Sequence, residues 1–327
     1  MKNWRRWIWP FIGVLCSVGG IAFYLLRYHR DMSWYETLRL PEAKTSPAGA
    51  LRVTWLGVST LLIDDGDTAF LTDGFFSRPG LLKMTHVAPD ESIIDATLAR
   101  LHVHELAAVI ALHSHYDHAL DSPIVAQKTS ALLVGSTSTA NIGRGYGLPR
   151  ERIRVVRDGE VLRFGRFKVT FILSVHSPND RYPGTIDDEL SAPASASAYR
   201  TGDCYSLLIE HAGHSILVHA SAGFVPGKLA ARRAEVVYLG VGNLGKQSHA
   251  YRETYWREVV QAVGAHRVIA IHWDDFFVPL SDTLPPLPPL MDDLDETMRD
   301  LTVFSKRDQV DLRLPREWSP ADPFTPL

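Results

Sequence analysis

The sequence is organised around the stretch Val109-Ile110-Ala111-Leu112-His113-Ser114-His115-Tyr116-Asp117-His118. Its first four residues are apolar and rich in β-branching, which predicts a short buried strand. Three histidines and one aspartate follow directly, and imidazole nitrogens and carboxylate oxygens are the ligands that zinc, iron and manganese accept. The alternative, a polar loop that happens to hold histidines, is disfavoured because the group stands at the end of a buried strand. The stretch therefore predicts a metal site.

The motif His-x-His-x-Asp-His in residues 113–118 resembles the signature of the metallo-β-lactamase superfamily. Within it, the likeness is to the branch that contains N-acyl phosphatidylethanolamine phospholipase D and the ascorbate-phosphate lactonases. The resemblance runs from about residue 51 to residue 280. It implies the α/β class and an αββα sandwich, with the metals held at one edge by loops from both sheets.

Two later histidines match further metal positions of this family. His176 follows the predicted strand 167–174, and His272 follows the predicted strand 267–271. The resemblance implies one ion held by His113, His115 and His176. It implies a second ion held by Asp117, His118 and His272. The expected cofactor is zinc, as one or two divalent ions, with iron and manganese as alternatives.

Asp73 and Ser221 complete the set of candidate site residues. Asp73, at the end of the predicted strand 69–72, matches an aspartate that lies behind the metal histidines and accepts an imidazole N–H, although capping a turn is an equally simple role. Ser221 stands where the family carries the aspartate that bridges both metals. A neutral hydroxyl is a poor bridge between two dications, so we expect the His113 cluster to hold its ion more tightly. His219 could compensate for the missing aspartate, although a buried strand histidine is the simpler interpretation. Asp274 or Asp275 could replace the lost carboxylate, although capping of a helix or turn is the simpler role.

Residues 7–26 contain no charged residue. A helix of about 20 such residues spans roughly 30 Å, the thickness of a hydrocarbon core. A buried core helix and a cleaved signal peptide are the alternatives, and no small-x-small cleavage site follows soon after the run. We expect a single-pass membrane anchor in residues 1–30, a linker in 31–50 and a hydrolase domain in 51–327. The cations at Lys2, Arg5 and Arg6 favour a domain on the non-cytoplasmic, periplasmic side.

The charge and composition of the chain argue against one class of partner. The net charge of −3 and the absence of a basic run with interleaved aromatic residues argue against a nucleic-acid partner.

Residues 180–202 are rich in Pro, Ser, Ala and Gly, and fit either a mobile flap beside His176 or a surface insertion.

The ligand set favours hydrolysis. Water bound to such a metal loses a proton near neutrality, and the resulting hydroxide attacks a carbonyl carbon or a phosphorus. Asp117 is the candidate catalytic residue, steering the water or accepting its proton. The favoured function is a membrane-anchored hydrolase of a phosphodiester or ester substrate, lipid-derived, with the apolar loop 74–92 receiving an acyl chain. The alternatives are a lactonase acting on a small cyclic ester, or a catalytically weakened relative that binds a ligand, which Ser221 would explain.

Overall fold

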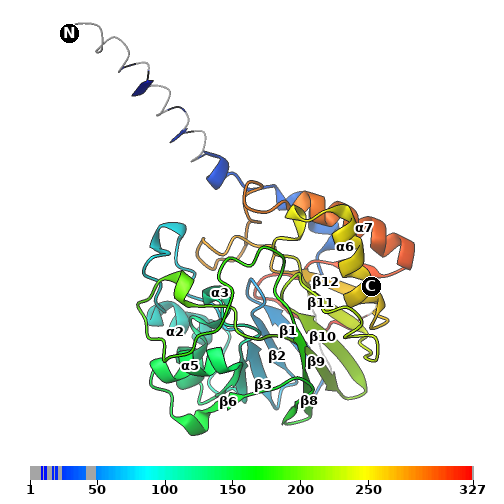
Figure 1. Cartoon of the computed structure of the whole chain (residues 1–327). Helices are drawn as coiled ribbons and strands as arrows, with labels where there is room; N and C mark the ends of the chain where they lie inside the picture. The colour runs from blue at the N-terminus through cyan, green and yellow to red at the C-terminus, as the bar shows by residue number, and fades with distance from the viewer. Residues whose placement is uncertain are drawn as a thin grey trace, which may run out of the picture.

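The computed structural model describes residues 9, 11–12, 17, 19–20, 24–41 and 49–325. Two mixed seven-stranded sheets lie at its centre, with helices on the outside (Figure 1). The first sheet has the order β14-β1-β2-β3-β4-β5-β6, and the second has the order β13-β12-β11-β10-β9-β8-β7. The strands of the first sheet are β1 Arg52–Trp55, β2 Leu61–Asp64, β3 Ala69–Thr72, β4 Ala108–Ile110, β5 Leu132–Gly135, β6 Ile153–Val155 and β14 Pro320–Ala321. Those of the second are β7 Val161–Phe164, β8 Phe167–Ser174, β9 Cys204–His211, β10 His214–His219, β11 Val236–Gly240, β12 Arg267–Ile271 and β13 Asp311–Arg313.

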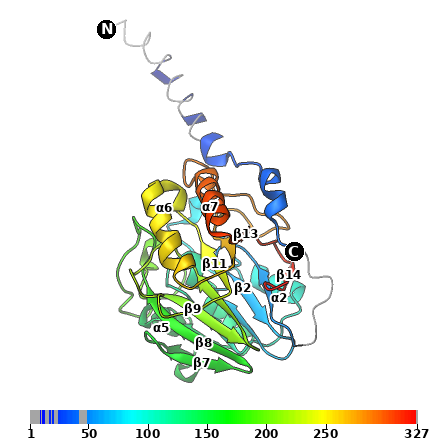
Figure 2. The same cartoon turned by 90° about the vertical axis from the view of Figure 1, so that its right-hand side faces the viewer.

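Helices cover the outer face of each sheet, and Figure 2 shows α6 and α7 together on the side of the second sheet. On the side of the first sheet lie α2 Glu91–Arg100, α3 Tyr116–Ala119, α4 Ser122–Lys128 and α5 Thr137–Gly145. On the side of the second lie α6 His249–Trp256, its π-helical continuation η6 Arg257–Gln261, and α7 Leu294–Asp308. Short 3₁₀ helices are η1 Met32–Leu38, η2 Leu81–Lys83, η3 Arg150–Arg152, η4 Ala196–Ala198 and η5 Leu244–Lys246. The predicted α/β class with two sheets is confirmed, and the structure shows that both sheets are mixed.

Strand β4 is apolar throughout because both of its faces are covered. Val109 of β4 packs in the cluster beneath α2 and α4, whereas Ile110 packs in the large core that joins the two sheets. Successive side chains of a strand point to opposite faces, so a strand between two layers needs an unbroken apolar run. In β12, the apolar residues 268–271 are buried in the same way, and the Arg267 side chain at the start of the strand is buried as well.

The directions of the strands bring the candidate site residues to one edge of each sheet. β3 and β4 are parallel, so Asp73 and His113 both follow carboxyl ends at the same edge of the first sheet. In the second sheet, β8 and β10 each pair antiparallel with β9, and β10, β11 and β12 are parallel. The ends that lead to His176, Ser221 and His272 therefore share an edge as well.

The predicted membrane-spanning segment, residues 7–26, lies for the most part outside the described residues. Within the residues that the structure does describe, no helix is both long and apolar enough to cross a membrane. The segment that follows it is attached to the domain: Arg30 forms an ion pair with Asp295 of α7 at 3.0 Å, and the Tyr35 hydroxyl donates to the same carboxylate. The boundaries drawn between anchor, linker and domain stay predictions.

A buried ion pair joins the two sheets beneath this edge. Arg78, which follows β3, pairs with Asp274, which follows β12, and both side chains are fully buried. The second oxygen of Asp274 accepts the backbone N–H of Val58 at 2.7 Å. Gly57 adjoins the pair at a φ of +86°, and a Cβ there would lie 1.8 Å from the guanidinium, so only glycine fits.

Asp274→Ala is expected to lower the free energy of unfolding by about 3–5 kcal/mol, because it leaves the Arg78 guanidinium buried without its counter-charge. Urea unfolding of the full-length protein measures this. Asp282→Ala, which removes the partner of Arg100 in a solvent-exposed pair, is the control and is expected to cost less than about 1 kcal/mol. Equal costs for the two variants would contradict the buried pair's role.

Candidate metal centre

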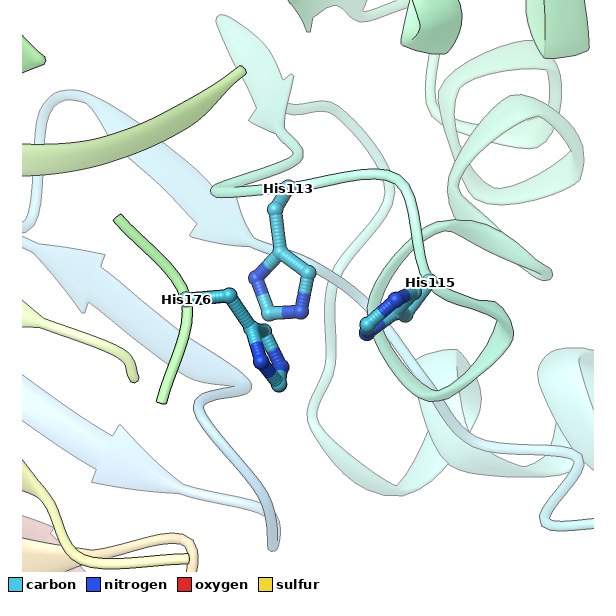
Figure 3. A group of neighbouring side chains, drawn as sticks. All are labelled: His113, His115 and His176. Atoms are coloured by element: carbon cyan, nitrogen blue, oxygen red, sulfur yellow. The ribbon is translucent and has the colours of Figure 1, made fainter. Parts of the chain in front are cut away.

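The first cluster consists of three histidines from two loops. His113 and His115 follow β4, and His176 follows β8 of the other sheet. Their rings converge on one small volume, with centroids 4.6–5.0 Å apart (Figure 3). One nitrogen of each lies within 4.8 Å of the others, a spacing at which they could hold one metal ion.

The second cluster lies directly beside the first. One ligand atom from each of Asp117, His118 and His272 lies within 4.8 Å of the others. Asp117 Oδ2 is 3.6 Å from Nε2 of both His118 and His272. The His113 and His118 rings are only 3.7 Å apart between centroids, so the clusters form one continuous site. The structure thus brings together all six residues that the sequence analysis proposed as ligands.

Unpaired nitrogens show that these residues fit a metal. His113 Nε2 and His118 Nε2 are buried and have no hydrogen-bond partner among the described residues. A buried polar atom without a partner is costly, and a divalent cation coordinated by such nitrogens removes that cost. Imidazoles together with one carboxylate suit zinc, iron or manganese, and the donor set does not choose among them.

Hydrogen bonds on the far side of the rings fix which nitrogen is free. His118 Nδ1 lies 2.8 Å from Asp73 Oδ2 and 3.1 Å from Ser59 Oγ. A carboxylate only accepts, so Nδ1 carries the proton and Nε2 keeps its lone pair for a cation. His176 Nδ1 lies 3.1 Å from the Ser177 carbonyl oxygen, which assigns its free nitrogen in the same way.

Three residues with strained backbone conformations lie around the second cluster. Val58, Asp73 and His272 have φ values of 49°, 56° and 61°, in the left-handed region that non-glycine residues rarely adopt. Hydrogen bonds hold them there: His272 N donates to Val58 O at 3.0 Å, and Asp73 N donates to Ile110 O at 2.8 Å. Strain of about 1–3 kcal/mol per residue is tolerated where the surroundings enforce it, most often at functional sites.

Burial favours the neutral, metal-binding form of four of these imidazoles. Burial, followed by the neighbouring imidazoles, lowers the pKa of His113 and of His118 well below the usual value. Burial also lowers the pKa of His176 to about 4, and that of His272 below its ordinary value.

A pocket of about 420 Å³ opens over both clusters. His115, Asp117, His176 and His272 reach its wall. Apolar side chains form much of the remainder: Leu81, Met84, Phe276, Phe277, Leu287, Leu290 and Met291. Arg181 and Lys246 add positive charge.

Comparison with known protein families identifies the superfamily to which this chain belongs. The model of the beta-lactamase superfamily domain matches residues 68–273, which include all six clustered residues. The chain belongs to the metallo-β-lactamase superfamily. Among curated proteins it is similar to UPF0173 metal-dependent hydrolases, with 27% identity over 127 residues to that of Chelativorans sp. (strain BNC1), covering 39% of this chain and 49% of the relative. The match to that of Agrobacterium fabrum has 25% identity over 128 residues, covering 39% and 48%. The chain thus spans about half the length of the curated relatives it matches.

Solved structures share the metallo-β-lactamase fold at low identity. Igni18, a metallo hydrolase from Ignicoccus hospitalis, has a TM-score of 0.51 and 14% identity, with 83% of this chain and 97% of that chain covered. An isothiocyanate hydrolase from Delia radicum gut bacteria has a TM-score of 0.50 and 16% identity, with 83% and 98% covered. CmlA, a diiron β-hydroxylase from Streptomyces venezuelae, has a TM-score of 0.50 and 16% identity, with 85% and 54% covered. These likenesses show the fold alone.

Ser221, the residue that the resemblance matches to a bridging aspartate, reaches the wall of the pocket. Its Oγ accepts the backbone N–H of Ser177 at 2.9 Å. The three candidate replacements are engaged elsewhere. His219 Nδ1 contacts Ser206 Oγ and its Nε2 contacts the Gly223 carbonyl oxygen, both at 2.7 Å, so this histidine belongs to the core. Asp274 pairs with Arg78, and Asp275 Oδ2 lies 2.9 Å from His29 Nε2.

Asp180 is the carboxylate that the sequence analysis missed. Its Oδ1 lies 3.2 Å from His115 Nε2. Burial opposes its ionisation, but hydrogen bonds from His115 and Thr201 and the charge of nearby imidazoles outweigh burial and hold the pKa of Asp180 well below its usual range. A single aspartate in a Pro- and Ser-rich segment gives no spacing signal. Only its place four residues after His176 distinguishes it.

Metal-depleted protein is expected to lose stability as the pH falls. The pKa of His176 is about 4 when folded and near 6.5 when unfolded, so below pH 6.5 the unfolded chain binds more protons. The stabilisation is present above pH 6.5 and is lost towards pH 4. Thermal unfolding in EDTA from pH 7.5 to 4.5 measures it, and His176→Asn is expected to flatten the dependence. Equal slopes for the variant and the wild type would contradict the assignment.

Ser221→Asp is expected to strengthen binding of the second divalent ion by tenfold or more, about 1.4 kcal/mol, because it adds a negative charge to the wall of the pocket that both clusters reach. Competition with a chromogenic chelator measures the affinity. Ser221→Asn has nearly the same shape without the charge and is expected to show no gain. Matching affinities for the two variants would disprove the explanation by charge.

Proposed function

We propose that this chain is a metal-dependent hydrolase of the metallo-β-lactamase fold that cleaves a phosphodiester or ester bond in a lipid-derived substrate. One observation carries the proposal: both ligand clusters open into a single pocket whose remaining wall is largely apolar. The names of the curated relatives support hydrolysis that depends on a metal. The resemblance of the sequence to the branch that contains N-acyl phosphatidylethanolamine phospholipase D supports the proposal of a lipid-derived substrate.

The residues of the site suit activation of water. A divalent ion held by the clusters would lower the pKa of water and polarise the substrate oxygen. Asp117 reaches the pocket wall, and its Oδ2 lies 3.6 Å from both His118 Nε2 and His272 Nε2. A carboxylate at that place can orient a water molecule in the pocket and accept its proton. The aspartate is therefore the proposed catalytic residue.

The pocket wall suits a substrate with one anionic and one apolar part. Arg181 makes no hydrogen bond or ion pair within the described residues, so its charge is available to a phosphate. Exposed apolar side chains lie near the same pocket: Leu82 beside it is 97% exposed, and Leu290 in its wall is 57% exposed. Exposed leucines next to a ligand pocket suit contact with acyl chains or with a membrane surface.

We further propose that residues 7–26 anchor the protein in a membrane and that the catalytic domain is periplasmic. His29 Nε2 lies 2.9 Å from Asp275 Oδ2, and the next residue, Phe276, is part of the pocket wall. The segment that follows the anchor thus contacts the element that forms the pocket. Figure 1 shows residues 24–41 and the 276–291 segment at the same end of the molecule. An anchor at this end would hold the pocket close to lipid head groups.

A substrate panel tests the proposal. Full-length protein loaded with Zn²⁺, Mn²⁺ or Fe²⁺ is expected to hydrolyse phospholipids in mixed micelles faster than small lactones, with His115→Ala lowering turnover at least about 100-fold. Release of product is followed by mass spectrometry. Turnover of lactones alone would assign the lactonase alternative. No turnover of either class, unchanged by His115→Ala, would support a ligand-binding relative.

Arg181→Ala is expected to raise KM for phosphodiesters about tenfold while leaving KM for neutral esters unchanged, because it removes the free cation of the pocket. Arg200→Ala removes an arginine of the same loop that does not reach the pocket and serves as the matched control. Equal effects on charged and neutral substrates would contradict a role in binding phosphate.

A further inference from the structure

Three oxygen atoms surround the far side of the His115 ring. Nε2 of His115 lies 3.0 Å from Thr201 Oγ1, 3.2 Å from Asp180 Oδ1 and 3.4 Å from the Tyr182 carbonyl oxygen. The carboxylate and the carbonyl can only accept a hydrogen bond. The Thr201 hydroxyl has one proton, and Asp180 Oδ2 and the Tyr182 carbonyl both stand ready to accept it. Nε2 is therefore the protonated nitrogen of His115, and Nδ1 is the one free to bind a metal.

The loop that carries Asp180 is fastened to the metal motif. Thr201 N donates to Tyr182 O at 3.0 Å, and Gly202 N donates to Gly184 O at 2.8 Å, which closes the base of the loop. Ser114 N, between the two motif histidines, donates to Thr201 O at 2.8 Å. Asp180 thus sits on a frame bonded directly to the segment that it orients. Residues 180–202, which the sequence could not assign, form this frame.

We propose that Asp180 is a positioning residue that fixes the tautomer and orientation of His115 and supplies the negative charge of the first cluster. All three ligands of that cluster are neutral imidazoles, and Ser221 adds no charge. The second cluster has Asp117 as a ligand and Asp73 behind His118. Asp180 gives the first cluster the same kind of support, since a carboxylate behind a metal-binding histidine raises the basicity of the ring.

The proposed role of Asp180 in metal binding can be distinguished by experiment from a purely structural role of the same residue. Asp180 also accepts the hydroxyl proton of Thr201, and a latch of this kind would stabilise the fold whether or not a metal binds. A latch alone affects unfolding of the metal-free protein. A positioning residue affects the affinity and the coordination spectrum of the ion.

The experiment compares Asp180→Asn with Asp180→Ala in full-length protein that also carries His272→Ala, so that only the first cluster holds an ion. Asparagine can still accept from Nε2 but lacks the charge, whereas alanine removes both. Affinity for Zn²⁺ by chelator competition is expected to fall about tenfold for Asn and up to about 100-fold for Ala. The visible absorption bands of the Co²⁺-substituted protein are expected to shift in both variants.

The control is Asp188→Asn, the same exchange at an exposed aspartate of the loop. Its affinity and spectrum are expected to match those of the parent. Affinity and Co²⁺ bands of Asp180→Ala that match the parent would overturn the proposal, whatever happens to the thermal midpoint in EDTA. Should Asp180→Ala fail to fold, Thr201→Val takes its place and is expected to weaken Zn²⁺ binding more than Asp188→Asn. No step requires a substrate, so the outcome is independent of the function proposed above.

Discussion

One buried carboxylate, that of Asp73, holds the centre of the site together. Its Oδ1 accepts the backbone N–H of Leu112 at 2.9 Å, while its Oδ2 accepts from Ser59 Oγ at 2.6 Å and contacts His118 Nδ1 at 2.8 Å. Burial raises the pKa of Asp73, and the hydrogen bonds from Leu112 N and Ser59 Oγ oppose that rise. The same contacts join the ends of β3 and β4 to His118 of the second cluster. Strand registry and the position of His118 therefore depend on the same side chain.

The chain departs from its family where negative charge is placed. The resemblance implies a carboxylate that bridges the two ions in the superfamily, and it matches that position to Ser221 in this chain. Its carboxylates stand behind the ligands: Asp73 behind His118, and Asp180 behind His115. A carboxylate behind a metal-binding histidine strengthens the binding of one ion and does not link that ion to the other. The two clusters should consequently behave more independently than a bridged pair, with the first governed by the loop of residues 180–202.

The sequence predicted which six residues lie together, because apolar runs mark buried strands and the histidines directly after them share an edge. It was less informative where contacts are distant in the chain. Asp180 has no local signature, and its role depends on a loop folding back onto Ser114. Helix α2 was not anticipated, although Asp90 caps it by accepting from Ser92 N and Ile93 N. His211 is buried with its Nε2 2.9 Å from Asp65 Oδ2, a partner that periodicity does not reveal.

The central claim is that residues from the ends of β4, β8 and β12 form two adjacent metal sites. Elemental analysis of the purified protein, after equilibration with excess divalent metal and gel filtration, tests it most directly when His113→Ala and His272→Ala are compared with the wild type. The account predicts that His113→Ala loses the tightly held ion and that His272→Ala keeps it. Retention of the same tightly held ion by both variants, or by neither, would contradict the account.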